Sequence, residues 1–176
     1  MVVRRRSPEL MRMHDPELSN AVLLCDEPAV ASILALDRSR ALTTDEQGQT
    51  LLMAAISRGA SLPILGALLD AGVDINAQGA EGNTALTLAI GEYTAEVLRF
   101  LLDRGADPNL GNPLILALWN DETDVEDLQA LIAAGADPLA QESDGMNAVE
   151  WAEDGGDDDF IRVLKRAARR SRKRDA

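Results

Sequence analysis

The residues that could perform chemistry are few in this chain. Among 176 residues there is one histidine, His14, and one cysteine, Cys25. A zinc site draws three or four ligands largely from these residue types, and nucleophilic catalysis needs a base beside the nucleophile. We find neither set and no glycine-rich phosphate-binding motif. We therefore predict no catalytic residue, no metal and no cofactor, with His14 on the surface and Cys25 buried in a helix.

Carboxylates are the second group of candidates for chemistry. Asp107 and Asp137 recur at matching places in similar segments, which suggests either paired carboxylates or a repeated turn in which each binds backbone N–H groups. The stretch GGDDDF, residues 155–160, resembles half of a calcium loop, but it lacks the alternating ligands and the distal glutamate. Turns and a helix start explain these acids more simply, because a helix N-terminus favours negative charge.

The elements around these residues repeat along the chain. The segments ALLDAGVDIN (67–76), FLLDRGADPN (100–109) and ALIAAGADPL (130–139) are near copies, and their glycines are 33 and 30 residues apart. A stretch such as DEQGQTLLMAAI, from Asp45, precedes the copies. Each unit predicts a turn, a short helix begun by Thr50 or Thr84, and a longer helix stopped by glycine. A period near 33 residues is typical of stacked repeats.

These units resemble the ankyrin repeat family, whose pattern is D-x-x-G-x-T-P-L-H-x-A followed by L-L-x-x-G-A-D-x-N-A. The resemblance covers about residues 17–170. It implies an all-α fold, a solenoid of stacked helix-turn-helix units with short β-hairpin-like turns. The matching positions are Asp45, Gly48, Thr50, Leu52, Ala55, Gly82, Thr84, Leu86, Ala89, Leu101, Leu102, Gly105, Ala106, Asp107 and Asn109.

The resemblance also sets expectations for the organisation of the chain. We expect one domain at 15–170 with units at about 15–44, 45–78, 79–111, 112–141 and 142–170. The first and last units differ most from the pattern, as the caps of a solenoid do. Residues 1–14 and 171–176 are expected to be flexible basic tails.

The chain departs from the family pattern at two kinds of place. Met53, Thr87, Ile115 and Glu150 stand where the family places histidine, which normally braces its own turn. The segment from Leu110 to Pro113 is several residues short. We therefore expect a stunted or missing hairpin there.

Charge is distributed unevenly. Residues 13–161 hold 28 acidic and five basic residues, while both ends are basic. An acidic body repels nucleic acid and attracts basic partners. No apolar run approaches the roughly 18 residues of a membrane span, and none follows the basic residues of 1–14 as a secretory signal requires. We expect a cytoplasmic protein, monomeric by itself, with no membrane contact.

The resemblance also implies which residues meet a partner. In ankyrin repeats, the ends of the first helices and the preceding turn tips line a concave groove. Tyr93 and Trp119 would be aromatic anchors there, although Trp119 could instead fill the space vacated by the short turn; Trp151 is expected to pack. The predicted partner-binding residues are Glu46, Gln47, Gln49, Arg58, Glu81, Asn83, Glu92, Tyr93, Trp119, Asn120, Asp121, Met146 and Asp154.

Three functions follow as hypotheses. The first is a non-enzymatic module that binds a partner with a basic patch through an acidic concave groove. A sharper version is an inhibitor or immunity protein that blocks a cognate basic toxin or enzyme. The alternative from another class is binding of nucleic acid or an acidic surface by RVLKRAARRSRKR, residues 162–174. Its apolar residues, such as Val163 and Leu164, predict a packed capping helix instead.

Overall fold

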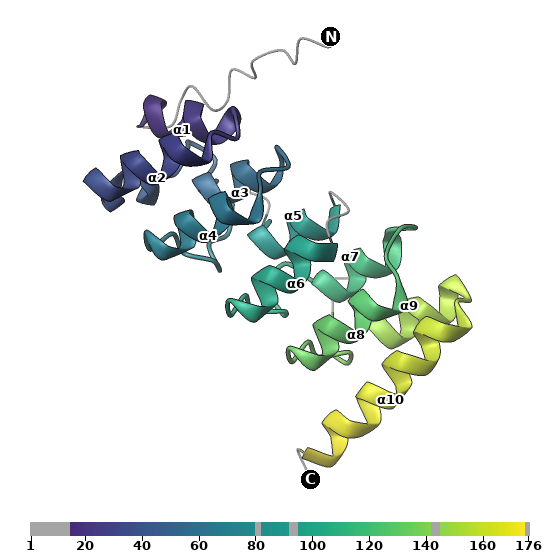
Figure 1. The fold of residues 1–176 in the computed structure, drawn as a ribbon. Coiled ribbons are helices and arrows are strands. Elements are labelled where there is room, and N and C mark those ends of the chain that lie inside the picture. Colours follow the sequence, from purple (N-terminus) through teal and green to yellow (C-terminus); the bar gives the residue numbers. More distant parts are fainter. Residues whose placement is uncertain (1–14, 80–81, 92–94, 142–144, 175–176) are drawn as a thin grey trace. The chain divides into compact units, whose positions relative to one another are not determined.

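The computed structural model describes residues 15–79, 82–91, 95–141 and 145–174. The chain divides into two compact units, residues 1–85 and 86–176. Each unit is described by itself, with the helix labels of Figure 1. His14, placed on the surface by the sequence, lies outside the described residues.

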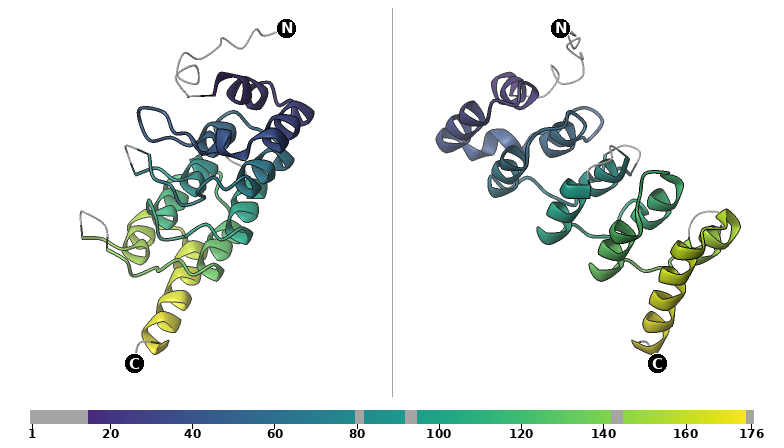
Figure 2. Two further views of the ribbon diagram at one scale, coloured as in Figure 1. Left: turned by 90° about the vertical axis from the view of Figure 1, so that its left-hand side faces the viewer. Right: turned by 45° about the vertical axis from the view of Figure 1, so that its right-hand side comes forward.

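The first unit consists of two helix pairs. Helices α1 (Pro16–Leu23) and α2 (Glu27–Leu36) form the first pair, and α3 (Leu51–Ile56) and α4 (Leu62–Asp70) form the second. A 3-10 helix, η2 (Arg38–Leu42), follows α2. Helix α1 packs on α2 and α3, and α4 packs on α2 and α3, so the pairs stack as two layers (Figure 2).

Helix α3 forms the centre of the first unit. All six of its residues are buried, because it lies between α1 and α4. Ala54 and Ala55 keep the helix thin, while Leu65 and Leu68 of α4 cover it and are fully buried. Each leucine removed from water in this way contributes about 1.5–3 kcal/mol.

The second unit continues the same pattern. Helix α5 (Ala85–Gly91) begins at the boundary and is followed by α6 (Ala95–Asp103), α7 (Pro113–Trp119), α8 (Val125–Ala133), α9 (Ala148–Gly155) and α10 (Asp158–Arg174). Helix α8 contacts α6, α7 and α10, and α9 contacts α7 and α10. The end of α10 extends past α8 in both views of Figure 2. The predicted all-α class is thus confirmed.

The helices begin and end where local rules predict. The hydroxyl of Thr50 accepts a hydrogen bond from the Met53 N–H at 3.2 Å, and Pro63 occupies the first turn of α4. Gly72, Gly105 and Gly135 end their helices with φ of 102°, 89° and 108°. Only glycine adopts this left-handed conformation without steric cost.

The turns that connect successive repeats differ from one another, as the sequence predicts. Thr44 and Thr50 form an antiparallel bridge, and the Asp45 N–H donates to the Gln49 carbonyl at 3.0 Å. This is a minimal β-hairpin. In the described segment 107–113 no bridge occurs, and the chain passes through Asn112, at φ 60°, directly into α7. The expectation of a stunted or missing hairpin is confirmed for this segment.

The four residues at the positions where the family pattern has histidine have other structural roles in this chain. Met53, Thr87 and Ile115 are buried. Glu150 instead completes a capping box: its carboxylate accepts from the Asn147 N–H at 2.9 Å, and Asn147 caps α9. Met53 and Ile115 thus pack in the core, Thr87 is a buried polar residue, and Glu150 caps a helix where the family pattern has histidine.

The expectation for Cys25 was wrong. The cysteine is exposed and lies in the turn between α1 and α2 with φ 53°. Helix α1 ends at Leu23, and Asp26 caps α2 by accepting from the Ala29 N–H at 3.0 Å. The chain must reverse in the residues between them, so Cys25 cannot continue a helix.

The aspartates that recur in the repeats act in turns. Asp107 accepts from the Asn109 N–H at 2.9 Å, and Asp137 accepts from the Leu139 N–H at 3.0 Å. Asp157 caps α10 by accepting from the Asp159 and Phe160 N–H groups. Among the described residues no group of three or more metal-ligating side chains is found. None of the described helices is both long and apolar enough to cross a membrane.

Candidate protein-binding site

Trp119 is the most exposed aromatic side chain of the second unit that the structure describes. It is the last residue of α7 and is 61% exposed. The preceding residues Leu114, Ile115 and Ala117 are buried and hold α7 in the core. Trp119 therefore does not fill a space left by the short turn, which was the alternative reading of this residue.

Trp151 of α9 lies against Trp119. The two ring centroids are 5.3 Å apart and the ring planes meet at 82°, an edge-to-face contact. Such pairs contribute about 0.5–1.5 kcal/mol beyond area burial. Trp151 is half-buried, and its indole N–H is buried without a hydrogen-bond partner among the described residues. Packing, as expected, is one role of Trp151; supporting the exposed indole of Trp119 is another.

The two indoles open onto a cavity of about 390 Å³. It is bounded by the end of α7 and the loop after it, by α9, and by the start of α10. Three carboxylates and three aromatic rings line it. The lining residues are Leu118, Trp119, Asn120, Asp121, Thr123, Trp151, Ala152, Asp154, Gly155, Asp157 and Phe160. The cavity thus combines an aromatic floor with an acidic rim.

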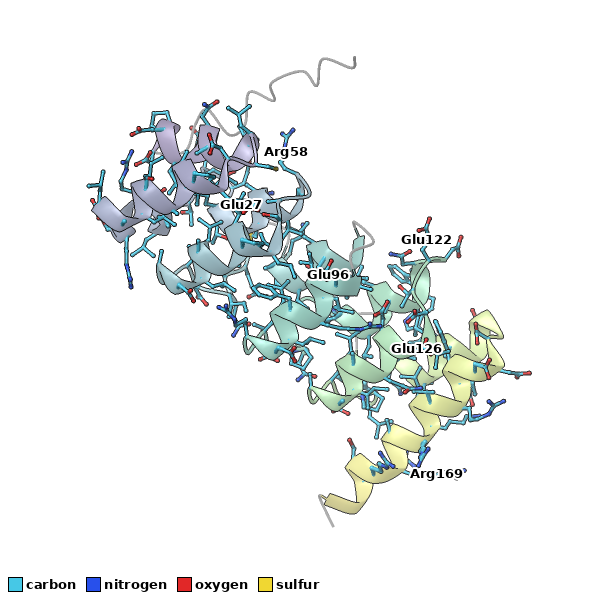
Figure 3. All side chains as sticks on the ribbon, viewed as in Figure 1. Glu27, Arg58, Glu96, Glu122, Glu126 and Arg169 are labelled. Atoms are coloured by element: carbon cyan, nitrogen blue, oxygen red, sulfur yellow. The ribbon has the colours of Figure 1, made fainter. Side chains whose placement is uncertain are left out.

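The loop after α7 is held by Asn120. The Asn120 side-chain amide donates to the Ile90 carbonyl at 2.6 Å, and its carbonyl accepts from the Glu122 N–H at 3.1 Å. Asn120 was predicted to touch a partner, but these bonds assign it a positioning role as well. Asp121 and Glu122, which follow it, are exposed, and Figure 3 shows Glu122 on this loop.

A buried carboxylate lies behind the loop. Asp127 of α8 is buried and pairs with Arg99 of α6 at 3.0 Å. Burial removes water from this carboxylate and raises its pKa. The nearby carboxylate of Asp124 also raises this pKa, whereas the guanidinium of Arg99 lowers it. Asp127 therefore ties α8 to α6 and is not part of the exposed acidic rim.

The comparison with known proteins decides the family. Residues 18–112, more than half of the chain, match a family model of ankyrin repeats in three copies. The chain belongs to the ankyrin repeat family. Ankyrin repeats generally mediate protein–protein interactions, and the family is typically non-enzymatic.

Two curated ankyrin relatives are similar to this chain. A Treponema pallidum (strain Nichols) protein described as ankyrin repeat-containing is 34% identical over 114 residues, covering 61% of this chain and 38% of the relative. The B-cell lymphoma 3 protein homolog of Mus musculus is 31% identical over 150 residues, covering 80% of this chain and 33% of the relative. The chain therefore spans about a third of the length of these relatives.

The structure brings together only some of the partner-binding residues that the ankyrin resemblance predicted. Trp119, Asn120, Asp121 and Asp154 line the cavity of the second unit. Met146 is half-buried and does not line it. Glu81, Glu92 and Tyr93 lie outside the described residues.

The remaining predicted residues belong to the first unit. Glu46 and Gln47 are exposed at the tip of its hairpin, and Gln49, Arg58 and Asn83 are half-buried. Figure 3 shows Arg58 near the end of α3. A partner-binding role for these residues stays a prediction.

Asp157 and Phe160 are among the cavity residues that sequence reasoning missed. Both lie at the start of α10, where the acidic run was interpreted as a helix start only. The helix-start role is correct, since Asp157 accepts from the Phe160 N–H at 3.0 Å. The signal available was that Asp154 lies close to this run in sequence, although α9 ends at Gly155 and the chain turns at Gly156 before α10 begins.

Proposed function

We propose that the chain is a protein-binding module whose acidic cavity in the second unit receives a basic side chain of a partner. The observation that carries the proposal is the exposed indole of Trp119. It is in edge-to-face contact with Trp151, with the ring centroids 5.3 Å apart. Asp121 and Asp154 line the same cavity. Rigid aromatic anchors within a polar rim are typical of binding hot spots.

A lysine or arginine side chain has the chemistry that fits this cavity. Its aliphatic stem can lie on the apolar face of Trp119, while its charged end approaches the carboxylates of Asp121 and Asp154. Each exposed ion pair alone contributes only about 0–1 kcal/mol. Most of the affinity would therefore come from contact with the indole, and the carboxylates would select for positive charge.

The overall charge supports a basic partner. Residues 13–161 hold 28 acidic and five basic residues, so the field around the chain attracts cations and speeds the encounter with a basic surface. Salt screens this attraction over about 8–10 Å at physiological ionic strength. Association with the partner should slow as salt rises, and a rate independent of salt would contradict the proposal.

The test is affinity capture from cells that make the protein, followed by measurement of the dissociation constant for the captured partner. Trp119→Ala should weaken binding by about tenfold or more, since hot-spot truncations cost at least about 2 kcal/mol. Leu36→Ala is the matched control, because Leu36 is an apolar side chain of the first unit that is 84% exposed. Equal affinity of wild type and Trp119→Ala would refute the proposal.

The same experiment addresses the inhibitory version of the function. If the captured partner is a basic enzyme or toxin, its activity can be measured with and without this protein. Loss of activity with wild type and recovery with Trp119→Ala would assign an inhibitory or immunity role. Unchanged activity in the complex would assign a role in assembly instead.

A further inference from the structure

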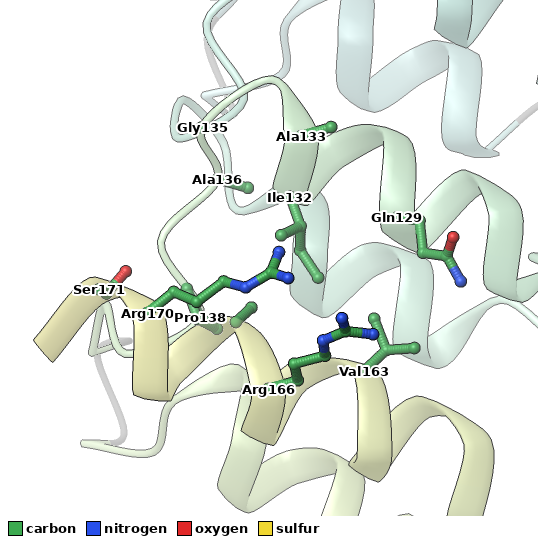
Figure 4. A pocket seen from close by; sticks show the side chains of 11 residues that line it. Gln129, Ile132, Ala133, Gly135, Ala136, Pro138, Val163, Arg166, Arg170 and Ser171 are labelled. Atoms are coloured by element: carbon green, nitrogen blue, oxygen red, sulfur yellow. The ribbon is translucent and has the colours of Figure 1, made fainter. Parts of the chain in front are cut away.

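A second and larger cavity lies in the same unit, away from the tryptophans. Its volume is about 590 Å³, and it is bounded by the end of α8, the loop at 135–138 and one face of α10 (Figure 4). Its lining contains two arginines and, among these described residues, no acidic side chain. The lining residues are Gln129, Ile132, Ala133, Gly135, Ala136, Pro138, Val163, Arg166, Ala167, Arg170 and Ser171.

Arg166 and Arg170 are one helical turn apart, and both extend from α10 toward α8 (Figure 4). Two other basic residues of α10 are paired: Arg162 with Asp159 at 2.7 Å, and Lys165 with Glu153 at 2.5 Å. In the part of the chain that the structure describes, no ion pair is found for Arg166 or Arg170. Like charges one turn apart repel each other, so an anion between them would relieve this repulsion.

The C-terminal end of α8 explains in part why the side chains of Arg166 and Arg170 extend toward this helix. The partial negative charge at the end of a helix attracts guanidinium groups, and α8 ends at Ala133 in the wall of the cavity. A guanidinium group carries five N–H donors in a planar fork. The end of one helix cannot satisfy two such forks, so donors remain for a ligand.

The walls beside the arginines are apolar. Ile132 and Pro138 form one side, and Val163 and Ala167 of α10 form the other. Ile132 and Val163 are only partly buried. The cavity therefore places two guanidinium groups beside an apolar surface that the rest of the chain covers only in part.

We propose that this cavity binds an acidic peptide segment of a partner protein. Carboxylates of the segment would be bound by the forks of Arg166 and Arg170, and an adjacent apolar side chain would cover Ile132 and Val163. A sugar-phosphate backbone has no apolar side chain that would cover these walls. The site is separate from the Trp119 cavity and opposite in charge, so it does not rest on the function proposed above.

The test uses the full chain and a fluorescein-labelled peptide of alternating glutamate and leucine. Binding is measured by fluorescence anisotropy. We expect saturable binding by the wild type, weakened about tenfold or more in the double variant Arg166→Gln, Arg170→Gln. The matched control is Arg169→Gln with Arg172→Gln, which removes the same charge from exposed positions of α10 outside the cavity; Figure 3 labels Arg169. The control should change affinity less than about twofold.

Several outcomes would overturn the proposal. An equal loss in both double variants would mean diffuse attraction to a basic helix. Equal binding of the peptide in which glutamine replaces glutamate would mean that carboxylates are not recognised. Tighter binding of a DNA duplex or of vesicles with anionic lipid, in competition with the peptide, would mean a different class of occupant.

A measurement on the wild type keeps the proposal falsifiable if the double variant does not fold. Amide shifts in a nitrogen–proton correlation spectrum should change on peptide addition at Ala136, Ala167 and their neighbours. Shift changes centred on Trp119 and Asp154 instead, or no shift changes at saturating peptide, would refute the site.

Discussion

Trp119 and Trp151 meet edge to face at 5.3 Å although 32 residues separate them. The contact joins the end of α7 to α9, which are neighbours in the second unit. One indole of the pair is exposed to solvent and the other is partly covered. An exposed aromatic ring held by a second ring is preorganised for binding, because little side-chain freedom remains to be lost.

The two indoles should differ in access to solvent. With Trp151→Phe, fluorescence reports only Trp119, and acrylamide should quench it strongly. With Trp119→Phe, only Trp151 reports, and quenching should be weaker. Trp119→Phe should change the free energy of unfolding by no more than about 0.5 kcal/mol, as exposed substitutions usually do. Equal quenching of the two variants would contradict the described exposure.

Asp15 should stabilise the first unit in its charged form. It accepts from the Leu18 N–H at 2.9 Å and pairs with Arg40. The hydrogen bond from Arg40 lowers the pKa of Asp15, and the backbone N–H of Leu18 acts in the same direction. Asp15→Asn keeps a good helix cap but loses the ion pair, so the free energy of unfolding at pH 7 should fall by about 1–2 kcal/mol.

The pH dependence of this variant follows from the sign of the shift. Because the folded-state pKa of Asp15 lies below the unfolded value, its contribution is present above the unfolded pKa. The contribution is lost as pH falls through the folded pKa. Urea unfolding of wild type and Asp15→Asn should therefore converge at acid pH, and a constant difference across pH would count against this ion pair.

Asp127 should show the opposite behaviour. Burial raises its pKa in the folded protein, so the charged carboxylate disfavours folding as pH rises through the unfolded and then the folded pKa. Asp127→Asn resembles the protonated form, and at pH 7 it should be at least as stable as wild type. This advantage should shrink as pH falls, since the wild-type carboxyl becomes neutral as well. A marked loss of stability at pH 7 would show that the ion pair with Arg99 stabilises the folded protein by more than the burial of the charge destabilises it.

Gly105 should be needed for its backbone conformation. It has φ 89°, and a Cβ added there would meet no atom within 4 Å, so Gly105→Ala introduces strain without a clash. The left-handed conformation costs a non-glycine residue about 1–2 kcal/mol. Gly91→Ala is the control, because Gly91 ends α5 with equal space and without a positive φ. Urea unfolding should show a loss for Gly105→Ala and none for Gly91→Ala.

The amino-acid sequence by itself determined the local features of this protein. The cap at Thr50, the glycine stops and the turn aspartates all involve partners within a few residues, so their spacing along the chain specifies them. The repeat of these local signals identified the family that the comparison confirms. The missing hairpin before Pro113 was predictable for the same reason, because too few residues remain to form one.

Only the tertiary structure decided which exposed side chains meet. Trp119 lies beside Trp151, and Asp121 shares a cavity with Asp154, because α7 packs on α9. Arg166 and Arg170, for which no ion pair is found among the described residues, face a cavity because α10 packs on α8. Helical spacing shows which residues share one face of a helix, but not which face of another helix they will meet. That depends on packing between helices distant in sequence.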